Sequence, residues 1–195
     1  MVRRHKDDAA IPPGGGDHQP RLFPGVMVSS TFKDLQEHRA AMIRAIKGEH
    51  LADVVMENDS AKPDGNMVDS SLQMVRDASA YVCVIGQRYG QTPECGRRNP
   101  DNLSITELEF NEAQRLGRPI LLFLMDDDHL LRKSDIETDA AKIEKLSAFR
   151  ERAKLESRES KLTRVMPLSK TFTTLAKRQF TPLRRCAAIL KRSAR

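Results

Sequence analysis

The sequence predicts a single three-layer α/β domain with a parallel sheet of about five strands. The first observation is an alternation of short apolar segments with longer segments in which apolar residues recur at helical spacing. The second is that the two clearest apolar segments, 80–86 and 119–125, are continuous instead of alternating with polar residues. Continuous apolar strands are typical of parallel sheets whose two faces are both covered by helices.

The predicted elements follow one another as alternating strands and helices. Strands are expected at 25–29, 53–56, 80–86, 119–125 and 162–166. Helices are expected to begin near residue 30 and then to cover 67–77, 104–117, 139–155 and part of 172–190. Ser30 or Thr31 is a suitable N-cap for the first helix, and Ser104 with Glu107 fits a capping box. Pro182 should kink or divide the last helix.

The chain of 195 residues divides into three expected parts. Residues 1–22 are rich in Pro and Gly and lack hydrophobic periodicity, so we expect a disordered leader. Residues 23–168 are expected to form the α/β domain, and residues 169–195 a basic C-terminal helical segment. The region 157–195 contains 11 Lys and Arg against one acidic residue, a net charge of +10, whereas the rest of the chain has a net charge of −4.

Composition limits the partners that we expect. The basic region has no interleaved aromatic residues and no nucleic-acid-binding motif. We therefore expect a solvated helix face or contact with an acidic neighbouring domain, and binding of nucleic acid is the less favoured alternative. No apolar run approaches the roughly 20 residues of a membrane span, and no secretory signal begins the chain. The three cysteines have no metal-ligand spacing, and Cys83 is expected to be a buried thiol, which favours a cytoplasmic protein.

The first candidate site segment is Ser29-Ser30-Thr31-Phe32, which follows the first predicted strand. Ligands of parallel sheets bind outside the carboxyl ends of the strands. Three hydroxyls and several backbone N–H groups at a helix start would suit an anion or a ribose phosphate. The alternative is that Ser30 or Thr31 only caps the helix, for which one hydroxyl is enough.

The second candidate segment is Gly86-Gln87-Arg88-Tyr89-Gly90, which follows the third predicted strand. Gly86 and Gly90 allow tight turning and the close approach of a ligand. Arg88 offers a fork for phosphate or carboxylate, and Tyr89 offers a flat face. The alternative is that Arg88 pairs with a local carboxylate and that Tyr89 closes the edge of the core.

The third candidate segment contains Glu107 and Glu109 at the start of a predicted helix. Positions i and i+2 of a helix point in different directions, so only one of the two should face a pocket, and the other should be solvated. Glu109 is the better candidate for the inward position, because Ala113 lies four residues beyond it on the same face. Such a carboxylate could stabilise an oxocarbenium-like state during N-glycosidic cleavage, and a surface carboxylate is the alternative.

Other sites receive less support from the sequence. The five histidines are scattered, and Walker A, GxGxxG and G-x-S-x-G sequences are absent. Asp126-Asp127-Asp128 at a strand end predicts a solvated loop or a Mg²⁺ site. We expect no required cofactor.

The candidate segments together resemble one known family, domain-of-unknown-function family 4062. The resemblance is based on Val26 to Leu35 with Glu37 and Arg39, on Ile85-Gly86-Gln87-Arg88-Tyr89-Gly90, and on Ser104 to Ala113. It covers about 25–125 well and continues more weakly to Val165. It implies a flavodoxin-like, TIR-like fold that is also related to nucleoside deoxyribosyltransferases. Members of this family usually place the domain ahead of STAND NTPase modules such as NACHT, or ahead of TPR or WD40 repeats. Neither follows here, so we expect a stand-alone version or a fragment.

The resemblance implies two alternative functions. In the first, the domain is an effector or interaction module of a signalling or defence protein, and it associates with itself or with a protein partner. In the second, it is an NAD⁺ or nucleoside N-glycosidase, because the related folds use a helix Glu with a small residue four positions on. Glu109 with Ala113 matches that spacing, and Glu107 is the second choice. Ser29 to Thr31 and Arg88 would then hold phosphate or ribose, and Tyr89 would pack on a ring.

Overall fold

The computed structural model describes residues 25–48, 51–54, 67–94, 96, 98–127, 129–159 and 163–168. These residues form one five-stranded parallel sheet in the order β2-β1-β3-β4-β5. The strands are β1 (Gly25–Ser30), β2 (Ala52–Val54), β3 (Ala80–Ile85), β4 (Ile120–Met125) and β5 (Thr163–Leu168). The predicted parallel α/β sheet is therefore confirmed. The expected leader at 1–22 and the basic segment at 169–195 lie outside the described residues.

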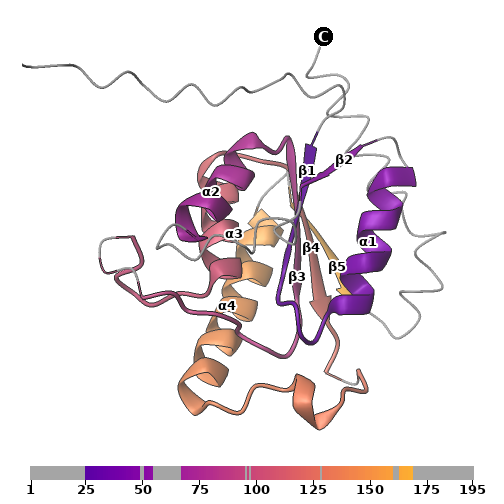
Figure 1. Cartoon of the computed structure of the whole chain (residues 1–195). Coiled ribbons are helices and arrows are strands. Elements are labelled where there is room, and N and C mark those ends of the chain that lie inside the picture. Colours follow the sequence, from indigo (N-terminus) through magenta and orange to yellow (C-terminus); the bar gives the residue numbers. More distant parts are fainter. Residues whose placement is uncertain are drawn as a thin grey trace, which may run out of the picture.

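Helices cover both faces of the sheet (Figure 1). Helix α1 (Gln36–Gly48) packs on one face, and α2 (Met67–Asp77), α3 (Ile105–Arg115) and α4 (Ala140–Glu159) pack on the other. Because side chains alternate along a strand, Val28 and Val84 join the core under α1, and Met27 and Cys83 join the core under α2, α3 and α4. None of the helices within the described ranges is long and apolar enough to cross a membrane.

The order of the strands creates a switch point between β1 and β3. The chain passes from β1 through α1 to β2 on one side, and then through α2 to β3 on the other side. The ends of β1 and β3 are therefore neighbours, and Ser29 pairs with Cys83 in the register. Chain segments that leave a parallel sheet in opposite directions at such a point leave a crevice outside the strand ends, where ligands of this architecture bind.

Two helix starts differ from the prediction. Helix α1 begins at Gln36, because the intervening residues form turns in which the Thr31 hydroxyl donates to Oδ1 of Asp34. Neither Ser30 nor Thr31 is the N-cap of α1. In α3, Ser104 Oγ does accept from the Glu107 backbone N–H at 3.3 Å, as predicted. The reciprocal half of the capping box is absent there, because the Glu107 carboxylate has other partners.

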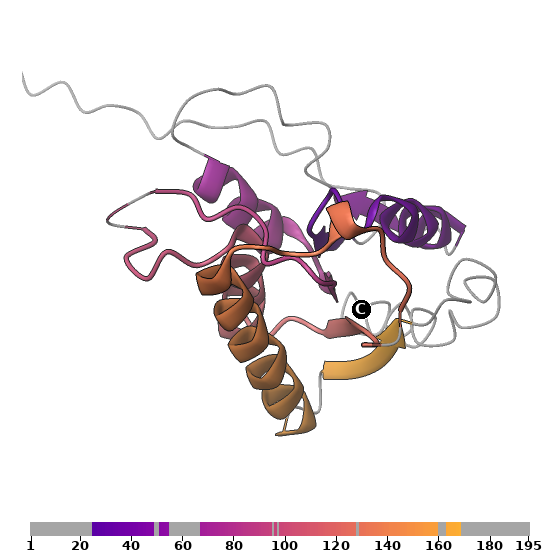
Figure 2. The ribbon, with the colours of Figure 1, turned by 90° about the horizontal axis from the view of Figure 1, so that it is seen from below.

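The segment between β4 and α4 crosses the carboxyl edge of the sheet. It passes α1, where the ring of His129 contacts that of His38 with their centroids 5.4 Å apart. It then reaches the end of β3, where the Glu137 N–H donates to the Gln87 carbonyl at 2.9 Å. The short 3₁₀ helix η2 (Lys133–Asp135) lies along this path (Figure 2). The switch point is thus bordered by the loops after β1 and β3 and by this crossing segment.

We expect Gly86→Ala to destabilise the domain by about 1–3 kcal/mol, because an added methyl group overpacks a filled site. A Cβ at Gly86 would lie 2.5 Å from Oδ2 of Asp34 and 3.3 Å from Leu35, and both side chains are buried. Gly96→Ala is the control, since a Cβ there meets nothing within 4 Å. Urea unfolding measures both variants. Equal stability of the two would show that the loops after β1 and β3 do not pack as described.

Candidate functional site

Glu109 is a buried carboxylate beside the switch point. It lies in the first half of α3 and is only 3% exposed. Ser29 of β1 donates its hydroxyl to Oε2, and Ser71 of α2 donates its hydroxyl to Oε1 at 2.6 Å. One carboxylate thus joins a central strand to two helices, and each of its oxygens is fixed by one hydroxyl.

Burial raises the pKa of Glu109 to about 7. The hydroxyls of Ser29 and Ser71 and the positive charge of Arg39 favour the ionised form, but the loss of hydration outweighs them. The side chain can therefore change its protonation state near neutral pH. Carboxylates with this property are suited to acid–base chemistry or to the stabilisation of a developing positive charge.

The loop after β1 holds the first predicted segment. Ser29 is buried and faces α3, whereas Ser30 accepts a hydrogen bond from the Arg39 guanidinium at 3.0 Å. Arg39 is itself buried and also donates to the Val28 carbonyl at 3.2 Å. The ring of Phe32 is 56% exposed at the surface. The segment therefore has a buried hydroxyl at Ser29, a second hydroxyl at Ser30 that Arg39 holds in place, and an exposed ring at Phe32.

The loop after β3 packs directly against the loop after β1. Gly90 has a φ of +92°, which side-chain-bearing residues rarely adopt, and a Cβ there would lie 2.9 Å from Cγ2 of Thr31. A Cβ at Gly86 would meet Asp34 in the same way. The structure therefore brings the first two predicted segments together, and the two glycines permit the close contact between them.

The hydrogen bonds of Arg88 and Tyr89 go to other parts of the chain. Arg88 Nη1 donates to the Ser134 carbonyl at 2.9 Å and so holds the segment that crosses the sheet edge. Tyr89 is 2% exposed, and its hydroxyl donates to Oε2 of Glu107 at 2.6 Å. In this arrangement the Tyr89 ring has no free face for a ligand, and the Arg88 fork binds backbone carbonyls.

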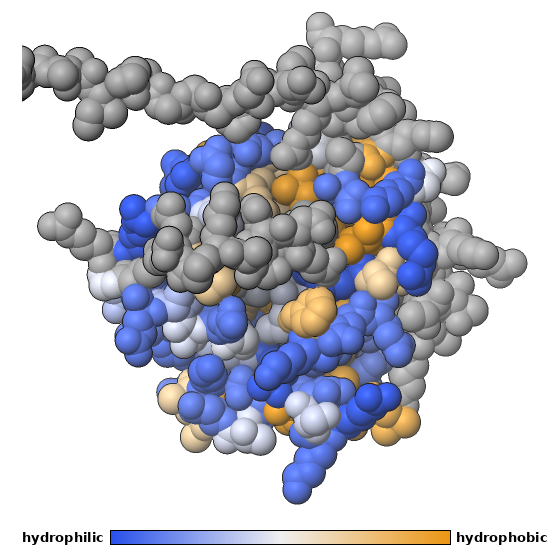
Figure 3. Space-filling model, viewed as in Figure 1, coloured by the Kyte–Doolittle hydropathy of each residue, from blue (hydrophilic) through white to orange (hydrophobic). Residues whose placement is uncertain are grey.

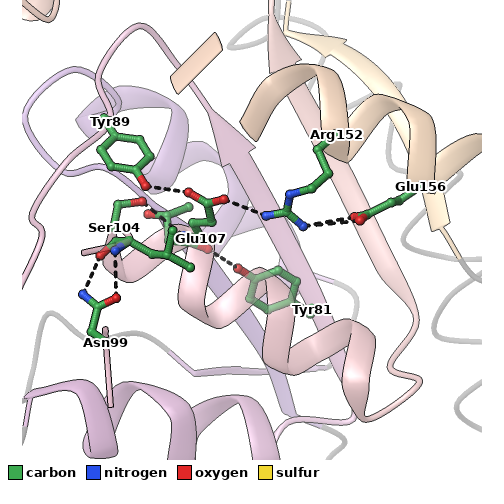
Figure 4. A network of polar contacts seen from close by, with 9 residues as sticks. Tyr81, Tyr89, Asn99, Ser104, Glu107, Arg152 and Glu156 are labelled. Atoms are coloured by element: carbon green, nitrogen blue, oxygen red, sulfur yellow. Dashed lines mark hydrogen bonds and ion pairs between the residues drawn. The ribbon is translucent and has the colours of Figure 1, made fainter. Parts of the chain in front are cut away.

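Glu107 is not solvated, which corrects the expectation for the second glutamate of α3. It is buried, and Arg152 of α4 binds its Oε1 at 2.7 Å while Tyr89 binds Oε2 (Figure 4). Arg152 also lies over the rings of Phe110 and Phe149, at 6.0 and 5.5 Å from their centroids. Helix α4 covers this side of α3, which the sequence of α3 alone could not indicate. Both oxygens of Glu107 are thus engaged in a polar network that joins α3, α4 and the loop after β3.

Two residues near the site were not among the predicted ones. Ser71 is almost fully buried, but its sequence signal is only a small polar residue in an amphipathic helix. Asp34 is 8% exposed, and its Oδ2 has no hydrogen-bond partner in the part of the chain that the structure describes. Burial raises the pKa of Asp34, against the effects of the Thr31 hydroxyl and the Arg88 charge. Asp34 belongs to the run Lys33-Asp34-Leu35 on which the family resemblance was partly based.

The acidic run after β4 shows no metal site in the described residues. Asp126 and Asp127 are exposed, and Asp127 lies 3.5 Å from the Arg150 guanidinium. Among the residues that the structure describes, no three His, Cys, Asp or Glu side chains are placed to hold one ion. Cys83 is fully buried as predicted, and burial raises the pKa of its thiol well above the usual range.

Solved structures with a similar chain path include two enzymes. The CMP N-glycosidase BcmB of Clostridium botulinum is 13% identical, with a TM-score of 0.44, over 78% of this chain and 95% of the other. The 2-desoxiribosyltransferase from Leishmania mexicana is 16% identical, with a TM-score of 0.40, over 61% of this chain and 76% of the other. No curated protein matches the chain in sequence.

The model of one protein family matches residues 25–173. This range contains all five strands of the sheet, both loops at the switch point and Glu109. The family is defined by a domain of unknown function, DUF4062. Since the match covers well over half of the 195 residues, the chain belongs to the DUF4062 family.

Proposed function

We propose that this domain binds a nucleoside or nucleotide at the switch point between β1 and β3 and cleaves its N-glycosidic bond. The observation that carries the proposal is Glu109, a buried carboxylate with a pKa of about 7 whose two oxygens are each fixed by a serine hydroxyl. Such a group needs little reorganisation when charge develops beside it.

In the proposed reaction, the bond between the sugar C1′ and the base nitrogen breaks. Its electron pair leaves with the base, and the positive charge is shared between C1′ and the ring oxygen of the sugar. The ionised Glu109 stabilises this oxocarbenium ion. The oxygen of a water molecule then bonds to C1′, and the proton of that water passes to the solvent. Nicotinamide leaves from NAD⁺ as a neutral molecule and needs no acid, whereas a neutral base takes up a proton as it leaves.

The surroundings of Glu109 suit a sugar ligand better than an ionic one. Its partners are neutral hydroxyls, and Ser30 and Thr31 add two more hydroxyl groups at the end of β1. Hydroxyl groups donate and accept hydrogen bonds and can therefore exchange partners with the hydroxyls of a sugar. The position outside the ends of β1 and β3 is also the one where parallel sheets of this strand order bind their ligands.

An interaction module of a signalling or defence protein is the second candidate. The observation that favours it is a set of exposed apolar side chains in the loop after β1 and in the segment that crosses the sheet edge, namely Phe32, Leu130 and Ile136. Figure 3 shows, however, that hydrophilic side chains dominate the described surface of one face of the molecule. The buried Glu109 has no role in such a module, so the enzyme is the better-supported proposal.

The first test of the proposal is loss of turnover in Glu109→Gln. We expect this isosteric change to lower the release of free base from NAD⁺, AMP, CMP and nucleosides by at least about a hundredfold, because a neutral amide cannot balance the sugar cation. Glu107→Gln is the matched control on the same helix and should keep activity in the folded protein. Chromatography of the products and thermal melting measure activity and folding. No turnover by the unaltered protein would exclude a glycosidase for these substrates and favour the interaction module.

The second test is a shift of the pH profile in Ser71→Ala. Because the ionised Glu109 is the active form, kcat of the unaltered protein should rise with pH and then level off, with the midpoint of the rise near pH 7. Removal of the Ser71 hydroxyl withdraws a hydrogen bond from the ionised form, so the midpoint should move up by about one pH unit. Ser71→Thr keeps a hydroxyl and serves as the control. An unchanged midpoint in Ser71→Ala would show that the ionisation of Glu109 does not cause the pH dependence of kcat.

The third test measures the ionisation of Glu109 without any substrate. Its pKa is raised from 4.5 to about 7 in the folded state, so its protonated form stabilises the fold below pH 4.5, and this contribution is lost as the pH rises through 7. Glu109→Gln does not titrate. Its free energy of unfolding, relative to that of the unaltered protein, should therefore increase by up to about 3 kcal/mol between pH 4.5 and pH 8. Urea unfolding across this range would contradict the shift if the difference between the two proteins stayed constant.

A further inference from the structure

Asp34 places a carboxyl group between the two loops of the switch point, and the proposed chemistry of Glu109 does not use it. Oδ1 accepts the hydroxyl of Thr31 in the loop after β1. Oδ2 lies against Gly86 in the loop after β3, where a Cβ would come within 2.5 Å of it. The backbone N–H of Gln87 is close enough to lower the pKa of the carboxyl group. Asp34 therefore links the two loops at the switch point.

The unpaired oxygen of Asp34 is costly for the free protein. The residue is 8% exposed, and Oδ2 has no hydrogen-bond partner among the described residues. Burial removes the hydration of this oxygen, and the Arg88 charge and the Gln87 N–H only partly replace it, since the pKa of the carboxyl group stays raised. Unpaired buried polar atoms are rare in proteins, so each one needs an explanation. A ligand that donates the missing hydrogen bond would explain both the unpaired oxygen and its position at the switch point.

The charge of a carboxylate determines which ligand groups can provide that donor. A carboxylate accepts hydrogen bonds from O–H and N–H groups and repels phosphate. Ser29, which holds Glu109, is the second-last residue of β1, and Asp34 lies in the turn that follows this strand. If Glu109 acts at C1′, the donors nearest to that atom are the hydroxyls of the sugar itself. Carboxylates that follow a strand and bind ribose hydroxyls are a recurring device of α/β folds.

We propose that Oδ2 of Asp34 accepts a hydrogen bond from the ribose hydroxyls of the ligand, so that the site selects a nucleoside or nucleotide with an intact 2′,3′-diol. This inference rests on the proposed function, whose substrate class it narrows. Gly86 covers Oδ2 in the unliganded structure, so binding includes a small separation of the two loops. Asp34 is thus a specificity-determining residue, whereas Glu109 performs the chemistry.

The experiment is a double-mutant cycle in which the carboxyl group of Asp34 and the hydroxyls of the ligand are removed separately and together. Binding of AMP, CMP, and their 2′,3′-dideoxy counterparts is measured by calorimetry in Glu109→Gln, which does not consume the ligand. Asp34→Asn is then added, because it keeps Oδ1 for Thr31 and replaces the unpaired acceptor with an amide NH₂ that cannot accept. We expect the ribonucleotide to bind about tenfold more weakly or worse after this change, and the dideoxynucleotide to bind unchanged.

Two further measurements separate this role from a structural one. Because Oδ2 is unpaired in the free protein, Asp34→Asn should not lower the melting temperature without ligand. Glu137→Gln is the matched control, since Glu137 is a buried carboxylate beside Gln87 whose oxygen already accepts the Thr138 N–H at 3.2 Å. That control should leave the preference for the ribonucleotide intact.

The possible outcomes distinguish the inference from the proposed function. Equal weakening of ribonucleotide and dideoxynucleotide by Asp34→Asn, or no weakening of either, would overturn the role of Asp34 and leave the glycosidase proposal standing. A clear fall in the melting temperature of Asp34→Asn would assign Asp34 a structural role and also overturn the inference. No binding of AMP or CMP to Glu109→Gln, and no turnover of either by the unaltered protein, would reject both proposals together.

Discussion

The hydrogen bonds between Glu109 and the hydroxyls of Ser29 and Ser71 are the constraint on which the candidate site depends. They connect β1, α2 and α3 through one buried carboxylate, in a place where burial alone favours the neutral acid. Without donors on both oxygens, the ionised form would be far more costly inside the protein. The two serines therefore keep the carboxylate able to ionise at neutral pH and fix its orientation. A helix surface glutamate would have neither property.

A second constraint is the contact between the loops after β1 and β3. The strand order makes these loops neighbours, but the absence of side chains at Gly86 and Gly90 determines how closely they approach. Asp34 occupies the space left at Gly86 with one oxygen unpaired. An unpaired buried oxygen is unfavourable for folding, and such departures from good packing are found mainly at functional sites.

Helix α4 holds the other side of the site in place. Arg150 donates to the carbonyls of Gly86 and Met125, at 3.0 and 2.6 Å, and so fixes the ends of β3 and β4. Arg152 binds Glu107, which in turn accepts the Tyr89 hydroxyl. The start of α3 is therefore held by Glu107 on one side and by Glu109 on the other, and the two neighbouring glutamates have separate roles.

The sequence by itself determined the architecture of this protein. Continuous apolar strands alternating with amphipathic helices imply a parallel sheet, because only burial on both faces favours such strands. The resemblance of the SSTF, RYG and TELE segments also indicated the family to which the chain belongs. The joint position of Ser29 to Phe32 and Gly86 to Gly90 followed from the rule that strand ends meet at one edge of a sheet.

Only the tertiary structure decided the environment of each side chain. Glu107 is buried because α4 brings Arg152 to it, Tyr89 turns inward to the same carboxylate, and Arg88 binds the segment that crosses the sheet edge. Ser71 and Asp34 became visible as site residues through contacts with residues of other elements, at Glu109 and Gly86. The spacing of apolar residues in the sequence shows which face of a helix or strand is apolar. Hydrogen-bond partners and unpaired oxygens depend on distances between elements that are far apart in the sequence.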